Sequence, residues 1–226
     1  MFTGIVQSRG WVRGVQPNAF GSRLVVDCSK WELQHFEPTH GDSICVSGVC
    51  LTVVEVTNQQ WLSFDVITET LSKTTLGEME IGNEVNLELP ISMSQPLGGH
   101  FVQGHVDGVG RVTHVCRGDN EWRVTVEPPS ELADCIVPKG SIAIDGVSLT
   151  IAAINKSVSN KVPTFEIALI PTTLQLTSLG QIAVGQRVNL EADIISKTVI
   201  HYLQGFCRHK TFGMTREDLQ KAGFVG

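Results

Sequence analysis

The chain has 226 residues, enough for one large domain or two small ones, and its 17 Lys and Arg against 23 Asp and Glu give a formal net charge of −6. It has no basic run, which argues against nucleic-acid binding, and no apolar stretch close to the roughly 20 residues that span a bilayer. The six cysteines lack CxxC and metal-ligand spacing, and MFTGIVQ lacks the flanks of a signal peptide. We therefore expect a fold that starts at Met1, reduced thiols and no metal site, in the cytoplasm or, for a plant protein without its transit peptide, the plastid stroma.

The chain contains one sequence pattern twice, in the same order. The aligned segments are GIVQSRGWV with GHVDGVGRV, DSICVSGVCLTV with GSIAIDGVSLTI, and TETLSKTTLGEMEIGNEVNLE with PTTLQLTSLGQIAVGQRVNLE. The central pair is identical at 6 of 12 positions and the last pair at 10 of 21. Two copies of this length do not make a solenoid, so the sequence predicts two homologous domains in tandem.

Within each copy the pattern indicates short strands. Segments such as SICV, CLTVVEV, WLSFDVI and EVNLEL are rich in Val, Ile, Leu and Thr, and Gly, Asn and Asp separate them. Such spacing predicts a small antiparallel barrel in each half. We expect LSKTTLGEME and its counterpart to cross a barrel end as a loop or short helical turn. An insertion in the second copy, around residues 155–163, should form a hairpin tip.

After the second copy the pattern becomes helical, with Ser196 as a plausible N-cap. The apolar residues of one predicted helix face are Val199, Tyr202, Leu203 and Phe206. Such a face must be buried by a barrel or by another subunit. For the tail, residues 208–226, the sequence is compatible with either a short helix capped at Thr215 or disorder.

The chain resembles the riboflavin synthase family over about residues 1–205, through MFTGIVQ, SGVCLTV, GGHFVQGHVDG, GSIAIDGVSLTI, LIPTTL and VNLEAD. The resemblance implies an all-β fold of two tandem six-stranded Greek-key barrels, residues 1–98 and 99–195, and a helix at 196–207 that joins a homotrimer. Each barrel would bind one 6,7-dimethyl-8-ribityllumazine, and one molecule would pass a four-carbon unit to the other. Riboflavin and 5-amino-6-(D-ribitylamino)uracil would result, with no metal or dissociable cofactor, and lumazine synthase is a candidate partner.

A reaction between two identical molecules gives a physical reason for the duplication. Holding the pair in reacting geometry is worth up to roughly 7–11 kcal/mol. Donor and acceptor need different chemical help, so aligned positions should differ where the chemistry occurs. The aligned pairs that differ are Cys50 and Ser148, Ser47 and Asp145, and Ile5 and His105. We predict that donor and acceptor occupy unlike barrels of neighbouring subunits.

Three of these residues are candidate catalytic groups, each with an ordinary structural alternative. His105 suits proton transfer because imidazole titrates near neutral pH, but a strand histidine is more often structural. Cys50 can add to an electrophilic ring carbon or assist proton transfer, or it is a buried small apolar residue. Ser148 is the corresponding polar group of the second copy.

Two carboxylates and a second histidine are further candidates, and each has a functional and a structural interpretation. Asp145 can pair with Ser148 in the chemistry, or it is a hairpin-turn residue. Asp193 matches a family carboxylate implicated in turnover, or it is a solvated strand end. For His100, near the junction of the copies, we favour a structural role.

The resemblance also implies the substrate contacts. The first pocket would comprise Gly4, Ile5, Val6, Cys50, Leu51, Thr52, Asp65, Val66, Ile67, Thr68, Glu69 and Thr70. The second pocket would comprise Gly104, His105, Val106, Ser148, Leu149, Thr150, Leu169, Ile170, Pro171, Thr172, Thr173 and Leu174. Lys139 matches a lysine that reaches the ligand of a neighbouring chain, or it is a surface lysine at a turn. Ser47 departs from the family, since many relatives carry Asn there and Ser lacks the amide.

Two other functions compete with this one. A non-catalytic antenna protein that binds lumazine or flavin would keep both barrels, but Cys50, His105, Ser148 and Asp193 favour the enzyme. A flavoprotein reductase would need a G-x-G-x-x-G turn in a βαβ unit. GGHFVQG leads into a strand pattern instead, so we discount this class.

Overall fold

The computed structural model describes residues 1–209 except 32–36, 58–59, 93–95, 120 and 156–162, and for residues 205–209 it describes the backbone alone. The first copy forms β1 (Ser8–Asn18), β2 (Gly21–Asp27), β3 (Ser43–Val46), β4 (Val49–Thr57), β5 (Trp61–Ile67), α1 (Thr68–Lys73), the 3-10 helix η1 (Thr75–Glu78) and β6 (Glu84–Glu88). The second copy forms β7 (Gly108–Arg117), β8 (Trp122–Glu127), η2 (Ser130–Cys135), β9 (Ser141–Ile144), β10 (Val147–Asn155), β11 (Thr164–Leu169), α2 (Pro171–Leu176), η3 (Ser178–Gln181) and β12 (Arg187–Ala192). The helix α3 (Ile194–His209) follows.

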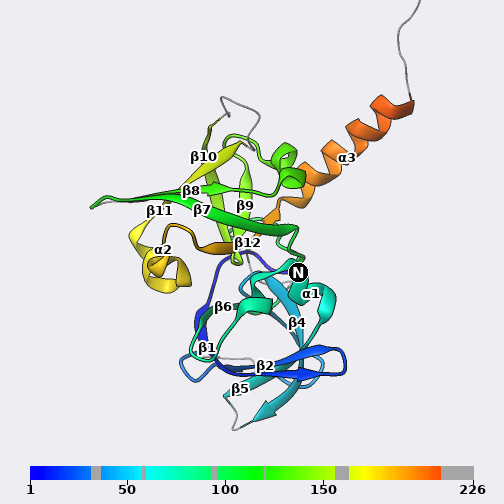
Figure 1. Ribbon diagram of the computed structural model, residues 1–226, viewed down its shortest axis with the longest axis vertical. Coiled ribbons are helices and arrows are strands. Elements are labelled where there is room, and N and C mark those ends of the chain that lie inside the picture. The colour runs from blue at the N-terminus through cyan, green and yellow to red at the C-terminus, as the bar shows by residue number, and fades with distance from the viewer. Residues whose placement is uncertain (32–36, 58–59, 93–95, 120, 156–162, 210–226) are drawn as a thin grey trace, which may run out of the picture.

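Each copy is a closed six-stranded antiparallel barrel, as predicted. The strand order is β1-β2-β5-β4-β3-β6 in the first barrel and β7-β8-β11-β10-β9-β12 in the second, so the topology is the same Greek key twice. Closure requires sharp bends, and β-bulges supply them at equivalent positions of the two barrels. The bulges lie between Val12 and Gly14, Val53 and Glu55, Val112 and His114, and Ile151 and Ala153. Figure 1 shows the second barrel above the first.

Alternation along the strands directs one apolar set into each barrel. Phe64 belongs to the first core and Phe165 to the second, and both are fully buried. The stretches that we expected to cross the barrel ends form the short helices α1 with η1 and α2 with η3, which place Leu76 and Leu179 in the two cores. Within the predicted insertion the described strands β10 and β11 pair antiparallel up to Asn155 and Thr164, while residues 156–162 lie outside the described part.

The two barrels meet through reciprocal contacts that follow an approximate two-fold axis. Phe2 and Val102 form an antiparallel bridge, with N···O distances of 2.7 and 3.1 Å, and both are fully buried. The tips of two hairpins also touch here, because a Cβ on Gly48 would lie 2.8 Å from the nitrogen of Gly146. The repeated sequence therefore packs against itself.

Two buried asparagines, one from each copy, join the barrels through equivalent hydrogen bonds. The Asn86 Nδ2 donates to the Asp145 carbonyl and the Asn189 Nδ2 donates to the Ser47 carbonyl, both at 2.8 Å. The Asn86 Oδ1 accepts from the amide of Ser178 and the Asn189 Oδ1 accepts from the amide of Thr75, at 2.8 and 2.7 Å. Each asparagine thus binds two backbone groups of the other copy.

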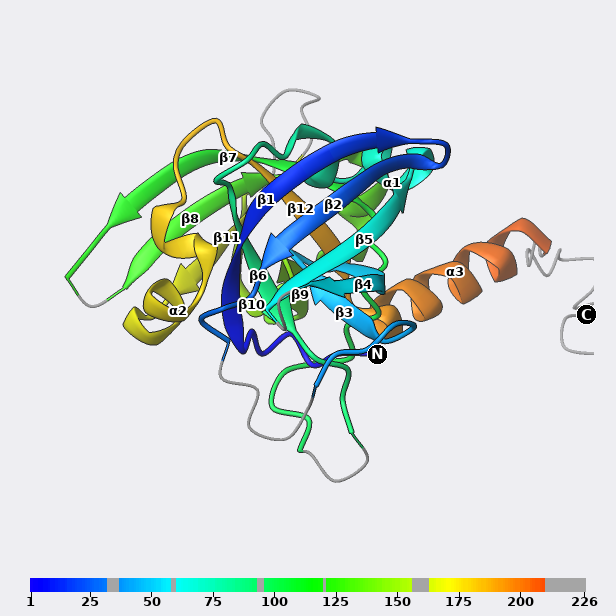
Figure 2. The ribbon, with the colours of Figure 1, turned by 90° about the horizontal axis from the view of Figure 1, so that it is seen from below.

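The helix α3 begins two residues before its predicted start, and Ser196 is not its N-cap. The Asp193 Oδ1 accepts from the Ile195 amide at 2.9 Å, and the Asp193 carbonyl accepts from the Lys197 amide at 3.0 Å, so Asp193 caps the helix. α3 extends away from the second barrel (Figures 1 and 2). In the part of the chain that the structure describes, no helix has the length and apolarity needed to cross a membrane. Of the predicted tail, residues 208–226, the first two belong to α3, and the part from residue 210 on lies outside the described residues.

The apolar face of α3 is exposed in the single chain. Val199, Leu203 and Tyr202 are 52%, 55% and 65% exposed. Among the described residues, neither barrel of the same chain covers this face.

Candidate functional site

Cys50 and Ser148 lie at equivalent places, one residue after the start of β4 and of β10. Both strands begin where a two-residue hairpin turn ends. The backbone amide of each residue forms a hydrogen bond with the other copy. The Cys50 amide donates to the Gly104 carbonyl at 2.9 Å, and the Ser148 amide donates to the Gly4 carbonyl at 2.7 Å. The segment before each barrel therefore crosses to the opposite barrel. We call residues 3–6 the first crossing segment and residues 103–106 the second.

This crossing places three residues of each predicted pocket beside the opposite barrel, whereas the sequence assigned them to their own barrel. Val6 belongs to the core of the second barrel, and Val106 packs against the core of the first. Gly4, Ile5 and Val6 thus accompany Ser148, whereas Gly104, His105 and Val106 accompany Cys50. The alignment of the copies assigned each segment to its own barrel because the following strand belongs there.

Close approach explains the glycine of each crossing segment. Gly4 has φ +74° and Gly104 has φ +78°, a region that disfavours other residues. A Cβ on Gly4 would lie 2.6 Å from the Ser148 Cβ, and one on Gly104 would lie 2.6 Å from the Cys50 Cβ. A side chain there would force either the crossing segment or the strand of the candidate catalytic residue to move.

Two buried glutamates hold the crossing segments in place. The Glu88 carboxylate accepts from the Thr3 amide at 2.7 Å and from the Gly4 amide at 3.0 Å. The Glu191 carboxylate accepts from the amides of Gly104 and His105 at 3.0 and 3.1 Å. Burial raises the pKa of both carboxyls, and these hydrogen bonds oppose that rise. Sequence reasoning missed both residues, although VNLE recurs unchanged in the two copies.

His100 directly contacts a candidate catalytic hydroxyl. Its Nδ1 lies 2.7 Å from the Ser148 Oγ, and its Nε2 is buried without a hydrogen-bond partner among the described residues. Burial lowers the pKa of His100, with a smaller opposing effect from the Asp193 carboxylate. A neutral imidazole in this position can exchange a proton with Ser148. Sequence analysis favoured a purely structural role for His100, since its spacing gives no sign of this contact.

A cavity of about 410 Å³ lies beside Ser148 on the outer wall of the second barrel. Its lining contains six predicted residues and three that the sequence did not indicate. The predicted ones are Lys139, Ser148, Leu149, Thr150, Ile170 and Thr173. The others are Arg123, Ala152 and Ala168.

The matching wall of the first barrel contains Asp65 in a fixed position. The Arg23 Nε and Nη2 donate to its two carboxylate oxygens at 2.8 and 2.9 Å, and the Asn18 Nδ2 donates to its Oδ1 at 2.9 Å. The hydrogen bond from Arg23 is the main cause of the lowered pKa of Asp65. On the adjoining helix α1, the Thr68 amide donates to the Phe20 carbonyl and Glu69 pairs with Lys73 at 2.8 Å.

Asp145 lies in the interface between the barrels and is not among the residues that line the cavity. It has φ +45° and precedes Gly146 with φ +80°, as Ser47 with φ +44° precedes Gly48, so both pairs form tight hairpin turns. The Asp145 Oδ1 accepts from the Asn189 amide at 2.8 Å, and burial raises the pKa of Asp145 to about 7. Of its two alternatives, the geometry favours the turn.

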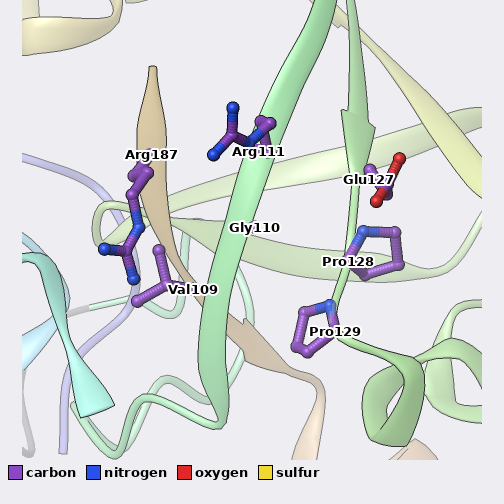
Figure 3. Close-up of a pocket in the computed structure, with 7 residues that line it drawn as sticks. All are labelled: Val109, Gly110, Arg111, Glu127, Pro128, Pro129 and Arg187. Atoms are coloured by element: carbon purple, nitrogen blue, oxygen red, sulfur yellow. The ribbon is translucent and has the colours of Figure 1, made fainter. Parts of the chain in front are cut away.

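A second hollow, of about 310 Å³, contains none of the predicted site residues. It lies over β7 between Arg187 of β12 and Pro129 after β8 (Figure 3). Arg111 is the cross-strand partner of both Arg187 and Glu127, and Arg187 pairs with Glu78 of the first barrel. These contacts join strands and barrels at the surface.

Comparison with known proteins identifies the family. The family model for the lumazine binding domain matches residues 3–90 and 103–193. A riboflavin synthase from Mycobacterium bovis is 44% identical over 199 residues, covering 88% of this chain and 96% of that protein. One from Bacillus subtilis is 36% identical over 226 residues, covering 99% and 100%.

Solved structures show the same likeness. A crystal structure of LumP with riboflavin has a TM-score of 0.73 at 29% identity, covering 85% of this chain and 99% of that one. LumP with 6,7-dimethyl-8-(1'-D-ribityl) lumazine gives 0.71 at 28%, with the same coverage. The family model and the sequence identities agree that this chain belongs to the riboflavin synthase family and is a transferase.

Proposed function

We propose that this protein is a riboflavin synthase that converts two molecules of 6,7-dimethyl-8-ribityllumazine into riboflavin and 5-amino-6-(D-ribitylamino)uracil. One molecule, the donor, gives a four-carbon unit to the other, the acceptor. Two carbon–nitrogen bonds of the donor break while two carbon–carbon bonds form on the methyl groups of the acceptor. Two substrate molecules and two product molecules contain the same atoms, so the reaction consumes no further reactant.

The observation that carries this proposal is the pair of equivalent but chemically unlike sites at Cys50 and Ser148. Both receive a glycine carbonyl from the opposite crossing segment, so both can present the same backbone groups to the same heterocycle. The first site has a thiol with His105, and the second has a hydroxyl with His100 and the apolar Ile5. Like binding surfaces with unlike reactive groups are what a donor and an acceptor of one compound require.

The chemistry begins with loss of a proton from a methyl group that is conjugated with the pteridine ring. The resulting anion is spread over the ring, and a nearby base of moderate strength can form it. His105 at the first site and the Ser148–His100 pair at the second are the groups that hold or move this proton. Cys50 can add to a ring carbon as a thiolate. Asp193, which caps α3 and acts on His100 electrostatically, supports the second site.

The active assembly would be a homotrimer in which neighbouring subunits supply donor and acceptor. The exposed apolar face of α3 supports this, because three such helices can bury one another. Lys139 lies in the wall of the cavity beside Ser148, at an exposed turn from which it can also contact a neighbouring subunit's ligand. The family resemblance also makes lumazine synthase a candidate partner.

The direct test is incubation of the purified protein with 6,7-dimethyl-8-ribityllumazine alone. We expect riboflavin and the ribitylaminouracil in equal amounts, with two substrate molecules consumed for each riboflavin, measured by chromatography with absorbance detection. Absence of riboflavin at saturating substrate would refute the proposal.

The second candidate is a non-catalytic protein that binds lumazine or flavin, and the structural likeness to LumP favours it. The same incubation separates the two functions. Tight lumazine binding without riboflavin formation would identify the binding protein. The hydrogen-bonded Ser148 and His100 favour the enzyme, because ligand binding alone needs no proton-transfer pair.

A further inference from the structure

The hairpin of β3 and β4 carries two cysteines directly opposite each other. Cys45 of β3 is the cross-strand partner of Cys50 of β4, and the two residues pack in the same small apolar cluster between the barrels. Both thiols are free. Opposite residues of an antiparallel pair place their side chains on the same face of the sheet. The candidate catalytic thiol therefore has a second thiol as its neighbour.

The hydrogen bonds of this hairpin make Cys45 and Cys50 a non-hydrogen-bonded pair. The Cys50 amide donates to the Gly104 carbonyl of the second crossing segment and not to β3. Further along the hairpin, the Val53 amide donates to the opposite Asp42 carbonyl at 2.8 Å, and the two kinds of pair alternate along an antiparallel ladder. In a non-hydrogen-bonded pair the Cα atoms are about 4.5 Å apart, and a disulfide accepts about 4.4–6.8 Å. The backbone therefore has the spacing that a disulfide needs.

The second copy lacks this pair of thiols. The cross-strand partners at the equivalent place are Ala143 and Ser148, so no such bond can form there. Because an alanine fills the position of Cys45 in the same fold, the backbone and the packing do not require a thiol at that position. Cys45 adds a chemical property to the first copy alone.

The two thiols differ in their access to solvent. Cys50 is half-buried, whereas Cys45 is 2% exposed. Burial raises the pKa of the Cys45 thiol well above its ordinary range, and the carboxylate of Glu88 adds to this effect. An oxidant in solution therefore meets Cys50 first, and Cys45 remains a thiol until Cys50 presents an oxidised sulfur to it.

We propose that oxidation by a peroxide joins Cys45 and Cys50 in a reversible disulfide, which stops the reaction at the first site. In the first step an oxygen of hydrogen peroxide bonds to the Cys50 sulfur, the O–O bond breaks and water leaves, which gives a sulfenic acid. In the second step the Cys45 sulfur bonds to the Cys50 sulfur, the S–O bond breaks, and the hydroxyl leaves as water with the proton of the Cys45 thiol. Two thiols are thus oxidised, and one peroxide is reduced to two waters.

The disulfide removes the thiol of the first site and leaves the second site unchanged. Disulfides that form in reducing compartments are usually transient, which suits a bond that a thiol reductant can reverse. The loss of turnover rests on the proposed function, because it assumes that Cys50 takes part in the reaction. Formation of the bond rests only on the geometry of the hairpin.

The test treats the purified full-length protein with hydrogen peroxide and follows the tryptic peptide 31–73 by mass spectrometry. This peptide contains Cys45 and Cys50 and no other cysteine. We expect the peptide to lose two hydrogens and turnover to fall in proportion to the oxidised fraction. Dithiothreitol should restore both the mass of the peptide and the turnover.

Two variants separate the roles of the cysteines. Cys45→Ala introduces the residue of the second copy and prevents the second step. Its Cys50 should then proceed to the sulfinic acid, which thiol reductants do not reduce, so dithiothreitol should no longer restore turnover. Cys116→Ala, which removes an exposed cysteine of β7 in the other barrel, is the matched control and should respond to peroxide as the wild type does.

The inference is overturned if peptide 31–73 gains oxygen without losing hydrogen, if its mass does not change, or if Cys45→Ala recovers as fully as the wild type. Full turnover in chains that carry the disulfide would also overturn it. Failure of the proposed function has a different signature, namely no riboflavin from the reduced protein, and the mass of the peptide is measured independently of that reaction.

Discussion

Cys50 and Ser148 have the same backbone environment, so the difference between them is chemical. Each donates its amide to a glycine carbonyl at 2.9 or 2.7 Å, and each is half-buried. Only Ser148 has an imidazole within hydrogen-bond distance, while the segment beside Cys50 carries His105, whose side chain is exposed. An exposed, ionisable group next to a thiol is suited to a ligand that arrives from solvent.

Replacing Cys50 or His105 by alanine should separate turnover from binding. Each change removes a reactive group but leaves the glycine carbonyl and the barrel wall, so lumazine affinity should change by less than about fivefold. Loss of a general acid or base costs roughly 10²–10⁴ in rate, and we expect turnover to fall by at least about 10². Steady-state rates with equilibrium titration of lumazine measure both. Wild-type turnover in both variants would remove these residues from the mechanism.

Ser148→Ala, His100→Gln and the double variant form a cycle that tests whether the two residues act together. Because one hydrogen bond of 2.7 Å joins them, either single change should remove most of the shared effect, and the double variant should be about as slow as the slower single one. His114→Gln, an exposed histidine on β7, is the control. Multiplicative effects on turnover would mean that the two residues act independently.

Alignment of the two copies pointed to Cys50 and Ser148 as equivalent positions that differ, but it could not show which residues surround them. Val6 and Val106 align perfectly, yet each packs in the opposite barrel, because alignment records descent and not packing. Arg123 was missed for a similar reason. Its pairing with Ala168 of another strand brings it to the cavity wall, and no motif links the two.

At the scale of elements, the two hairpin turns at the interface show how one backbone accommodates two side chains. Ser47 and Asp145 share φ near +45°, and each side-chain oxygen accepts from a buried asparagine amide. The serine is neutral, whereas the aspartate must either take up a proton or remain ionised in a buried place. The pKa of Asp145 is therefore raised to about 7 by burial.

Asp145→Asn should stabilise the protein above neutral pH and reduce the dependence of its stability on pH. The native carboxyl keeps its proton to about pH 7 while the unfolded one ionises near pH 4, so the native state binds more protons between these values and stability falls as pH rises. The protonated carboxyl of Asp145 contributes at most roughly 4 kcal/mol to the free energy of unfolding. This contribution is complete below about pH 4 and is lost as the pH rises through about 7. Asn keeps the acceptor for Asn189 and tolerates positive φ.

Denaturant unfolding at pH 5 and pH 8 measures this effect. The midpoint of Asp145→Asn should exceed that of the wild type at pH 8, with a smaller difference between the two pH values. An equal decline with pH in both proteins would assign the dependence to other groups, such as Glu88 and Glu191, whose pKa values burial also raises.

Gly104→Ala should disrupt the second crossing segment more than its φ value explains. The new Cβ would lie 2.6 Å from the Cys50 Cβ, so the segment or β4 must move. Gly41→Ala is the matched control, because Gly41 also has positive φ but no atom within 4 Å of a Cβ. The control should cost about 1–2 kcal/mol in stability from the backbone alone, and Gly104→Ala about 2 kcal/mol more with loss of turnover. Equal melting temperatures would show that the contact is easily relieved.

The sequence pattern predicted which strands, turns and helices form more accurately than it predicted where they begin and end. The strands and the two tight turns follow from β-branched runs and from Ser-Gly and Asp-Gly, which suit the positive φ of both positions. The start of α3 was misplaced because both Ser196 and Asp193 are capping residues. The side chain of Asp193 reaches the Ile195 amide and begins the helix there, so Ser196 lies in its first turn.

At the scale of the whole molecule, the two barrels are closed and packed against each other, whereas α3 exposes apolar side chains. Closure removes strand edges, and Asn86 and Asn189 each bond one backbone carbonyl and one backbone amide of the other copy. By contrast, Val199 and Leu203 on one face of α3 are both more than half exposed. Contiguous apolar patches of this kind mark protein contacts.

The double variant Val199→Glu with Leu203→Glu should therefore convert the proposed trimer into single chains. Two buried charges per helix would cost more than the apolar contact provides. His201→Glu, exposed on the opposite side of the same helix, is the matched control and should keep the mass of the wild type. Light scattering after size exclusion measures the mass. If neighbouring subunits supply donor and acceptor, turnover must fall together with the trimer, whereas each isolated chain still binds lumazine. A single-chain variant with full turnover would place both reacting molecules within one chain, and an unchanged mass would show that α3 does not join the subunits.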